Sequence, residues 1–140
     1  MQSVHGIPKL LFTGLLLILS ITLAGCSKST PASLAPFQPE IVNNQDAFSL
    51  QATNVSNVST TLVYSWKNSG AQATINHSTT TTGGSTLLTI KDSLGTTVYS
   101  KALSPSLNEP TLPAGVAGTW SVSLTLTNYS GTLNFRAEKL

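Results

Sequence analysis

The sequence contains a single cysteine, few charged side chains and few aromatic ones. Cys26 is the only cysteine among 140 residues, which excludes an intrachain disulfide framework and a metal site built from several cysteines. Charged residues account for 9% of the chain and aromatic residues for 6%, whereas Ser, Thr, Asn and Gly are abundant. This composition disfavours helices with charged outer faces and favours short strands joined by polar turns.

The charged residues do not gather into a segment of one sign. The formal net charge is +2 with Lys9 included, so the chain that follows residue 25 is near neutral. A nucleic-acid-binding protein collects its basic residues on one surface, because phosphate neutralisation dominates its affinity. Here the basic residues after residue 45 are scattered, and we expect no nucleic-acid partner. They are Lys67, Lys91, Lys101, Arg136 and Lys139.

Catalytic groups are equally sparse. A hydrolytic triad needs a base beside a nucleophile and an acid that orients the base, but His77 is the only histidine after residue 25. His77 continues the alternation of Ala73 and Ile75, or lies at the rim of the Thr-rich loop, and both positions favour a structural role. No Asp-x-Asp run typical of calcium loops occurs. The carboxylates are far apart in sequence, at Glu40, Asp46, Asp92, Glu109 and Glu138. We therefore expect no enzyme, no metal site and no cofactor.

The N-terminus has the organisation of an export signal. Residues 1–9 are polar and weakly basic, and residues 10–23 form an uncharged, mainly apolar run. A transmembrane helix needs about 20 apolar residues to cross the hydrocarbon core of a bilayer. This run is shorter and is not followed directly by a basic cluster, so we interpret residues 1–25 as a signal peptide rather than a permanent anchor.

The residues at the end of this signal carry a first resemblance. Leu23-Ala24-Gly25-Cys26 closely resembles the lipobox of bacterial lipoproteins. The resemblance implies cleavage between Gly25 and Cys26 and attachment of lipid to Cys26, with two or three acyl chains making membrane attachment effectively permanent. In a Gram-negative envelope, Ser27 would resemble a signal for outer-membrane sorting. The alternative is an ordinary signal peptide followed by a chance cysteine.

Residues 26–45 are expected to tether the lipidated cysteine to a domain that spans residues 46–140. The segment is rich in Pro, Ser, Thr, Ala and Asn and has no sustained apolar period, which is typical of an extended linker. Fully stretched, it would reach up to roughly 60 Å. The alternative is that Phe37, Ile41 and Val42 add an edge strand to the domain.

From residue 47 onward, apolar and polar residues alternate, the spacing that places one face of a strand on a core. We expect turns at residues 68–70, 92–95 and 128–131, and loops at residues 79–84 and around Pro105, Pro110 and Pro113. Seven or eight short strands in about 95 residues favour an all-β fold, an antiparallel β-sandwich or jelly roll. The positions expected to face the core include Phe48, Leu50, Ala52, Leu62, Tyr64, Trp66, Ala71, Ala73, Ile75, Leu88, Ile90, Trp120, Val122, Leu124, Leu126, Leu133, Phe135 and Ala137.

A second resemblance lies within this domain. It is carried by Leu87-Leu88-Thr89-Ile90-Lys91-Asp92-Ser93-Leu94-Gly95, Val98-Tyr99, Leu112-Pro113-Ala114-Gly115 and Gly118-Thr119-Trp120-Ser121-Val122. In this order the segments resemble the bacterial pre-peptidase C-terminal domains. The resemblance implies a small jelly-roll-like sandwich of the kind appended to secreted enzymes, some of which bind polysaccharide or collagen-like ligands.

Aromatic residues are the natural candidates for a sugar-binding surface, because aromatic rings stack on apolar faces. Trp66 and Trp120 share the alternation of their core-facing neighbours and are expected inside. Tyr99 and Tyr129 are less constrained, and Tyr129 falls in the expected turn at residues 128–131. We therefore take Tyr129 and Tyr99 as candidate ligand-binding residues, with Tyr129 expected to be exposed.

Together these features predict a non-enzymatic, lipid-anchored protein of the cell envelope that faces the periplasm or the cell surface. Its partners would be the membrane, through lipid on Cys26, and a glycan or an envelope protein bound by the loops. One alternative is a structural envelope lipoprotein without a specific ligand. Another is a small accessory subunit of a secreted hydrolase.

Overall fold

The computed structural model describes residues 33–109 and 111–140. These residues form seven antiparallel strands and no helix, so the described chain holds no helix that could cross a membrane. The expectation of an all-β antiparallel fold is confirmed. The predicted signal peptide, its cleavage point after Gly25 and the lipid-bearing Cys26 lie outside the described residues. The strands are β1 (Glu40–Asn44), β2 (Ala47–Asn68), β3 (Ala73–His77), β4 (Thr80–Lys91), β5 (Thr97–Lys101), β6 (Leu107–Glu109) and β7 (Gly118–Lys139).

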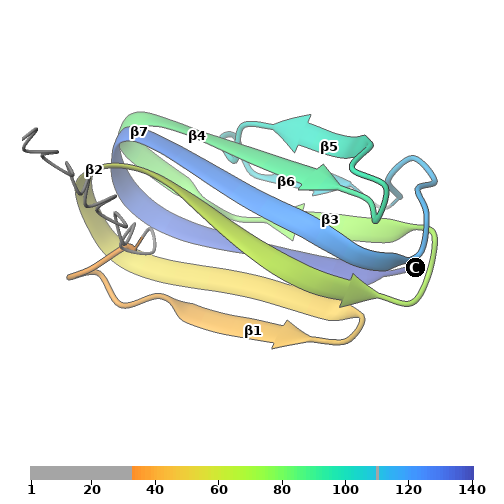
Figure 1. Ribbon diagram of the computed structural model, residues 1–140. Coiled ribbons are helices and arrows are strands. Elements are labelled where there is room, and N and C mark those ends of the chain that lie inside the picture. The colour runs from red at the N-terminus through yellow and green to blue at the C-terminus, as the bar shows by residue number, and fades with distance from the viewer. Residues whose placement is uncertain (1–32, 110) are drawn as a thin grey trace, which may run out of the picture.

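Two 22-residue strands, β2 and β7, organise the fold. They pair along almost their whole length, from Ala47↔Glu138 to Asn68↔Gly118. Figure 1 shows both strands turning back at the same end of the molecule. As a result the two ends of β2 meet, and the backbone N–H of Asp46 donates to the carbonyl of Lys67 over 2.8 Å.

The bend divides the hydrogen-bonded sheet into two arms that face each other. The first arm contains β1, residues 47–52 of β2, residues 133–139 of β7, β3 and β6; the second contains residues 60–68 of β2, residues 118–126 of β7, residues 85–91 of β4, and β5. Phe48 in the first arm touches Tyr64 in the second, with ring centroids 5.4 Å apart. The strands thus belong to one folded-over sheet, and the finer expectation of a sandwich or jelly roll is not confirmed.

Local backbone chemistry explains the bend. The β2–β7 ladder shifts register three times between Ala52 and Thr60, and such bulges increase strand curvature. Asn54, Asn57 and Asn128 all have positive φ, between 46° and 54°, a region that Asn tolerates better than most residues. We call residues 53–59, 80–84 and 127–131 the bend end.

The core lies between the arms and follows the predicted alternation. Trp66 and Trp120 meet edge to face, with centroids 5.7 Å apart, and Phe48 stacks on Phe135 at 5.8 Å. Of the positions expected to face the core, all but Ala71 and Tyr64 are buried; Tyr64 is partly buried against the cluster, and Ala71 is exposed because β3 begins only at Ala73. The period-two pattern therefore identified the inner faces of β2, β3, β4 and β7.

Three predicted breaks contain strand instead. Leu107–Glu109 forms β6 within the loop expected around Pro105, Pro110 and Pro113. The hairpin turn expected at residues 128–131 is wrong, because β7 continues through it as one strand that folds back together with β2. The loop expected at residues 79–84 is also largely strand, since β4 starts at Thr80. By contrast, the turn at residues 92–95 is confirmed: the Gly95 N–H donates to the Asp92 carbonyl over 3.0 Å, and β4 pairs with β5 across it.

The N-terminal segment of the described chain is part of the domain. Ile41 and Val42 lie in the edge strand β1, which pairs with β2, so the alternative of an added edge strand is confirmed. Leu34 is buried, Phe37 packs against the core, and the Phe37 N–H donates to the Leu34 carbonyl. A flexible tether extending to residue 45 is therefore wrong, because residues 34–44 are docked on the sheet.

Candidate functional site

The two tyrosines selected from the sequence are both buried. Tyr129 is fully buried, and its hydroxyl donates to the Thr80 carbonyl over 3.0 Å. Burial raises the pKa of its phenol above the ordinary 10.0. The expected exposure of Tyr129 is wrong because β7 continues inward where a turn was predicted, and Tyr99 is only 4% exposed. No aromatic ring of the described chain is fully exposed: Phe37 and Tyr64 are partly buried, and the other aromatic residues are buried.

His77 lies where the alternation places it. Its side chain is 2% exposed, on the same inner face of β3 as Ala73 and Ile75. In the ladder it stands opposite Phe135 of β7. Within residues 33–109 and 111–140, no group of three or more His, Cys, Asp or Glu side chains is placed to hold a metal ion. The position of His77 is that of a core residue.

Asp92 is buried, and both oxygens of its carboxylate accept hydrogen bonds from the backbone. It accepts backbone N–H groups from Leu94 at 3.0 Å, Thr96 at 2.8 Å and Val116 at 3.0 Å. Burial raises the pKa of this carboxyl, but hydrogen bonds from Thr96, Val116 and Leu94 outweigh that effect and lower it below the ordinary 3.8. The turn position of Asp92 was predicted, and the structure adds that Asp92 joins the β4–β5 turn to the loop before β7.

The strongest cluster of available polar groups lies on the outer surface of the first arm. Residues of β3, β6 and β7 line a hollow of about 500 Å³ there. Every lining side chain can form hydrogen bonds, and two carry opposite charges. We call this surface the polar face; it consists of Thr74, Asn76, Ser78, Asn108, Asn134, Arg136 and Glu138.

Strand register explains why these side chains converge. The inner positions of β3 and β7 are occupied by core residues, so the alternate positions point outward. Asn76 pairs with Arg136 of β7 on one side and with Asn108 of β6 on the other. Arg136 in turn pairs with Ser49 of β2. The four strands therefore carry one polar row across about 14 Å, at roughly 4.8 Å per strand.

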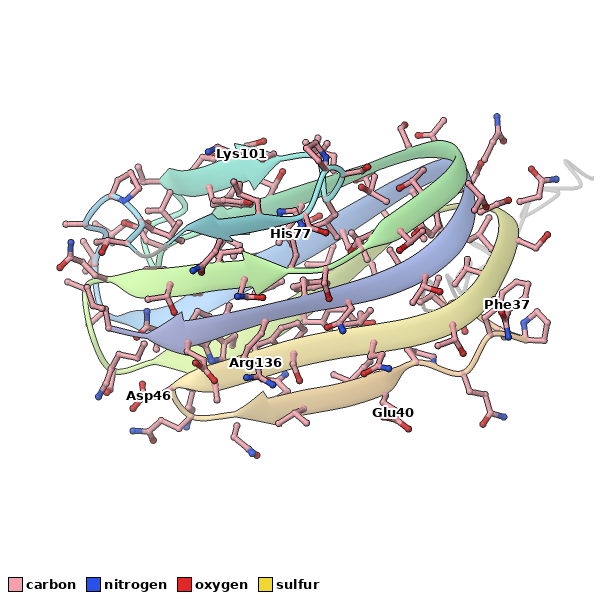
Figure 2. The ribbon with its side chains drawn as sticks, turned by 180° about the vertical axis from the view of Figure 1, so that it is seen from behind. Phe37, Glu40, Asp46, His77, Lys101 and Arg136 are labelled. Carbon is pink, nitrogen blue, oxygen red and sulfur yellow. The ribbon has the colours of Figure 1, made fainter. Side chains whose placement is uncertain are left out.

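The charged groups of the polar face remain available to a ligand. Arg136 Nε lies 3.8 Å from Glu138 Oε1, with the two side chains 64% and 50% exposed. An exposed pair of this kind is worth about 0–1 kcal/mol, so a ligand can replace it at little cost. Figure 2, seen from the side of the first arm, shows Arg136 on β7 in the middle of this surface.

Other hollows are smaller and offer fewer polar groups. One of about 210 Å³ lies at the end opposite the bend, beside Lys67 and Ser69. Another of about 290 Å³ lies on the second arm, between Val63 and Lys91. The polar face is therefore the best candidate binding surface of the described chain.

The alternation of apolar and polar residues in the sequence carries a signal for this surface, although no local motif does. The alternation that identified Ile75 and Phe135 as core residues also makes Asn76 and Arg136 outward neighbours, once β3 is placed beside β7. That pairing joins residues about 60 positions apart, and spacing within a single strand does not reveal it. Binding by the loops stays a prediction, and the polar face, which lies on strands, is a separate candidate surface.

Comparison with known proteins assigns the chain to no family. No protein-family model matches it, and no curated protein matches its sequence. The functional interpretation therefore rests on the polar face and on the N-terminal sequence.

Proposed function

We propose that this protein is a non-enzymatic, lipid-anchored binding module of the cell envelope whose polar face holds a glycan. The observation that carries the proposal is the row of outward hydrogen-bonding side chains centred on Arg136. Amides, hydroxyls, a guanidinium and a carboxylate together donate and accept hydrogen bonds, as sugar hydroxyl groups also do. Because no described aromatic ring is fully exposed, the sugar would be held by hydrogen bonds rather than by stacking.

The shape and polarity of the surface favour a glycan over a protein partner. The cores of protein interfaces are apolar and rich in aromatic residues, but the polar face includes none of the exposed large hydrophobic residues. Its row crosses four antiparallel strands, β6, β3, β7 and β2, along one face of the sheet, which suits an extended polymer. Arg136 additionally favours sugars that carry a carboxylate.

The anchor part of the proposal rests on the sequence. Residues 1–25 have the pattern of an export signal, and Leu23-Ala24-Gly25-Cys26 resembles a lipobox. Lipid on Cys26 would hold the domain at the envelope, at the outer membrane in a Gram-negative cell. The resemblance to pre-peptidase C-terminal domains supports an accessory binding role, and two of its segments pair where Ile90 of β4 lies opposite Val122 of β7.

The test is binding of the full-length, detergent-solubilised protein to immobilised glycans. The set would contain neutral oligosaccharides, uronic-acid oligosaccharides and peptidoglycan fragments. We expect binding to at least one class. Arg136→Ala should weaken it about tenfold or more, since a hydrogen bond from a charged group contributes about 1.5–3 kcal/mol, and Asn76→Ala should weaken it about two- to tenfold, since a neutral hydrogen bond contributes about 0.5–1.5 kcal/mol. Lys67→Ala, at the end opposite the bend, is the control and should bind as the wild type does.

Two results would count against the proposal. One is no binding above background to any of the glycans, which would favour a structural envelope protein without a ligand. The other is binding that Arg136→Ala and Asn76→Ala leave unchanged, which would place the ligand elsewhere on the domain.

A further inference from the structure

The described chain enters the domain at the bend end. Leu34 is 1% exposed and belongs to the core cluster, against which Phe37 packs. Gln38 lines a small hollow together with Thr53, where β2 begins to bend. Figure 2 accordingly shows Phe37 at the bend and Asp46 at the opposite end. The attachment point of the preceding chain is thus fixed at one end of the molecule.

The chain between this point and Cys26 is short. Six residues lie between Cys26 and Ser33, and the seven Cα-to-Cα steps span at most about 25 Å when fully extended. The nine residues from Thr60 to Asn68 in the second arm cover about 30 Å. With lipid on Cys26, the bend end therefore stays within about 25 Å of the bilayer, whereas the opposite end can lie about 30 Å farther out.

The two ends of the domain also differ in surface charge. None of the described residues of the bend end is charged; they are Ser, Thr, Asn, Gly, two valines and the buried Tyr129. Such a surface can exchange hydrogen bonds with lipid headgroups without removing a charge from water. Charged side chains gather at the other end, where Lys139 Nζ lies 3.2 Å from Asp46 Oδ2. Lys67 and Lys91 are further exposed charged residues at that end.

We infer that the bend end is a membrane-facing surface that lies against the lipid headgroups, while the charged end points away from the bilayer. The inference rests on the proposed lipid anchor at Cys26. In this orientation the strands of the first arm run away from the membrane, and the polar face stands at the side of the domain. A ligand parallel to the bilayer can then reach Arg136 without obstruction by lipid.

The test is energy transfer from a labelled protein to acceptor-labelled lipid in phosphatidylethanolamine–phosphatidylglycerol vesicles. The full-length lipidated protein is used, so that a cysteine introduced elsewhere is its only free thiol. Ser56→Cys places the donor at the bend end, and Leu94→Cys places it on an exposed turn at the opposite end. We expect clearly greater transfer from position 56, because it lies about 30 Å closer to the bilayer. Equal transfer, or greater transfer from position 94, would overturn the inference.

Two further variants separate this inference from the anchor on which it rests. Cys26→Ser should abolish cosedimentation with vesicles; retention would refute the anchor itself. An insertion of 20 Gly/Ser residues after Lys28 should keep the protein on the vesicles but reduce transfer from position 56, because the short connection no longer holds the bend end down. Unchanged transfer would show that chain length does not set the orientation. Fluorescence of the buried Trp66 and Trp120 reports whether each variant is folded.

Discussion

The carboxylate of Asp92 accepts a hydrogen bond from the backbone N–H of Val116 over 3.0 Å, across 24 residues of sequence. The hydroxyl of neighbouring Ser93 donates to the Val116 carbonyl over 3.0 Å, and Trp120 Nε1 donates to the same carbonyl over 2.8 Å. The turn that begins at the buried Asp92 therefore positions the loop before β7 and, through Trp120, one of the largest side chains of the core.

Asp92→Asn should destabilise the domain, although it barely changes the shape of the side chain. The amide has a single acceptor oxygen in place of two and adds a donor, so at least one of the Leu94, Thr96 and Val116 N–H groups loses its partner. We expect a lower midpoint of thermal unfolding, measured by circular dichroism. Glu40→Gln, on the exposed strand β1, is the matched control and should melt as the wild type does. Equal midpoints for both variants would contradict the importance of the junction.

The stability of the domain should also fall in acid, because two aspartates have lowered pKa values. For Asp46, the Ser69 N–H at 2.7 Å is the main cause, aided by the Ser69 hydroxyl and by Lys139. For Asp92, the three backbone N–H groups outweigh the opposing effect of burial. When the folded pKa is lowered, the unfolded chain binds more protons at acidic pH, so the stabilisation is complete above the unfolded value and is lost below it.

Urea unfolding at a series of pH values checks this dependence. The ordinary pKa is 3.8 for both carboxyls, so the contribution of each should be constant from pH 7 to about pH 5 and decline as the pH falls through the lowered pKa values. Asp92→Asn should flatten part of that decline. A wild-type stability that stays constant down to pH 2 would show that neither carboxylate is held as described.

Adjacent glycines in β4 provide a matched test of the bend. Gly84 has a φ of 68°, and a Cβ there would overlap the backbone carbonyls of Thr127 and Asn128. A Cβ on Gly83 would lie 3.7 Å from Ser130 Cβ, an ordinary contact. We expect Gly84→Ala to lower the free energy of unfolding by about 1–3 kcal/mol and Gly83→Ala to change it by less than about 0.5 kcal/mol. Similar losses for both would mean that the bend does not require Gly84.

The sequence predicts which residues face the core, but it does not predict the bend. Alternation identified Leu50, Trp66 and Phe135 as core residues, because burial of one strand face imposes a period of two regardless of how the strands pair. The Asn-Tyr-Ser-Gly run at residues 128–131 was interpreted as a turn because Asn and Gly both tolerate positive φ. In the structure the same tolerance serves a bulge in a continuous strand. A local preference for positive φ does not distinguish a hairpin turn between two strands from a bend within one continuous strand.

The candidate site could be predicted even less well. Each residue of the polar face lies at an unremarked outward position, and only the pairing of β3 with β7 and β6 brings Asn76 beside Arg136 and Asn108. Tyr129 is the opposite case. It is a candidate ligand-binding residue only if residues 128–131 form an exposed turn, and in the structure these residues belong to β7. Predictions from side-chain type alone therefore favoured aromatic residues that the fold uses for its core.

Leu34 should prove to be a structural residue of the domain rather than part of a linker. Leu34→Ala removes a fully buried side chain and should lower the free energy of unfolding by about 2–3 kcal/mol, measured by urea denaturation of the full-length protein in detergent. Hydrogen exchange should rise at the Phe37 N–H, which donates to the Leu34 carbonyl over 2.8 Å, because the segment opens more often. Leu94→Ala, at a position that is 75% exposed, is the matched control and should change stability by less than about 0.5 kcal/mol. Equal stability of the two variants would mean that residues 33–39 do not contribute to the core, and the short connection to Cys26 would lose its support.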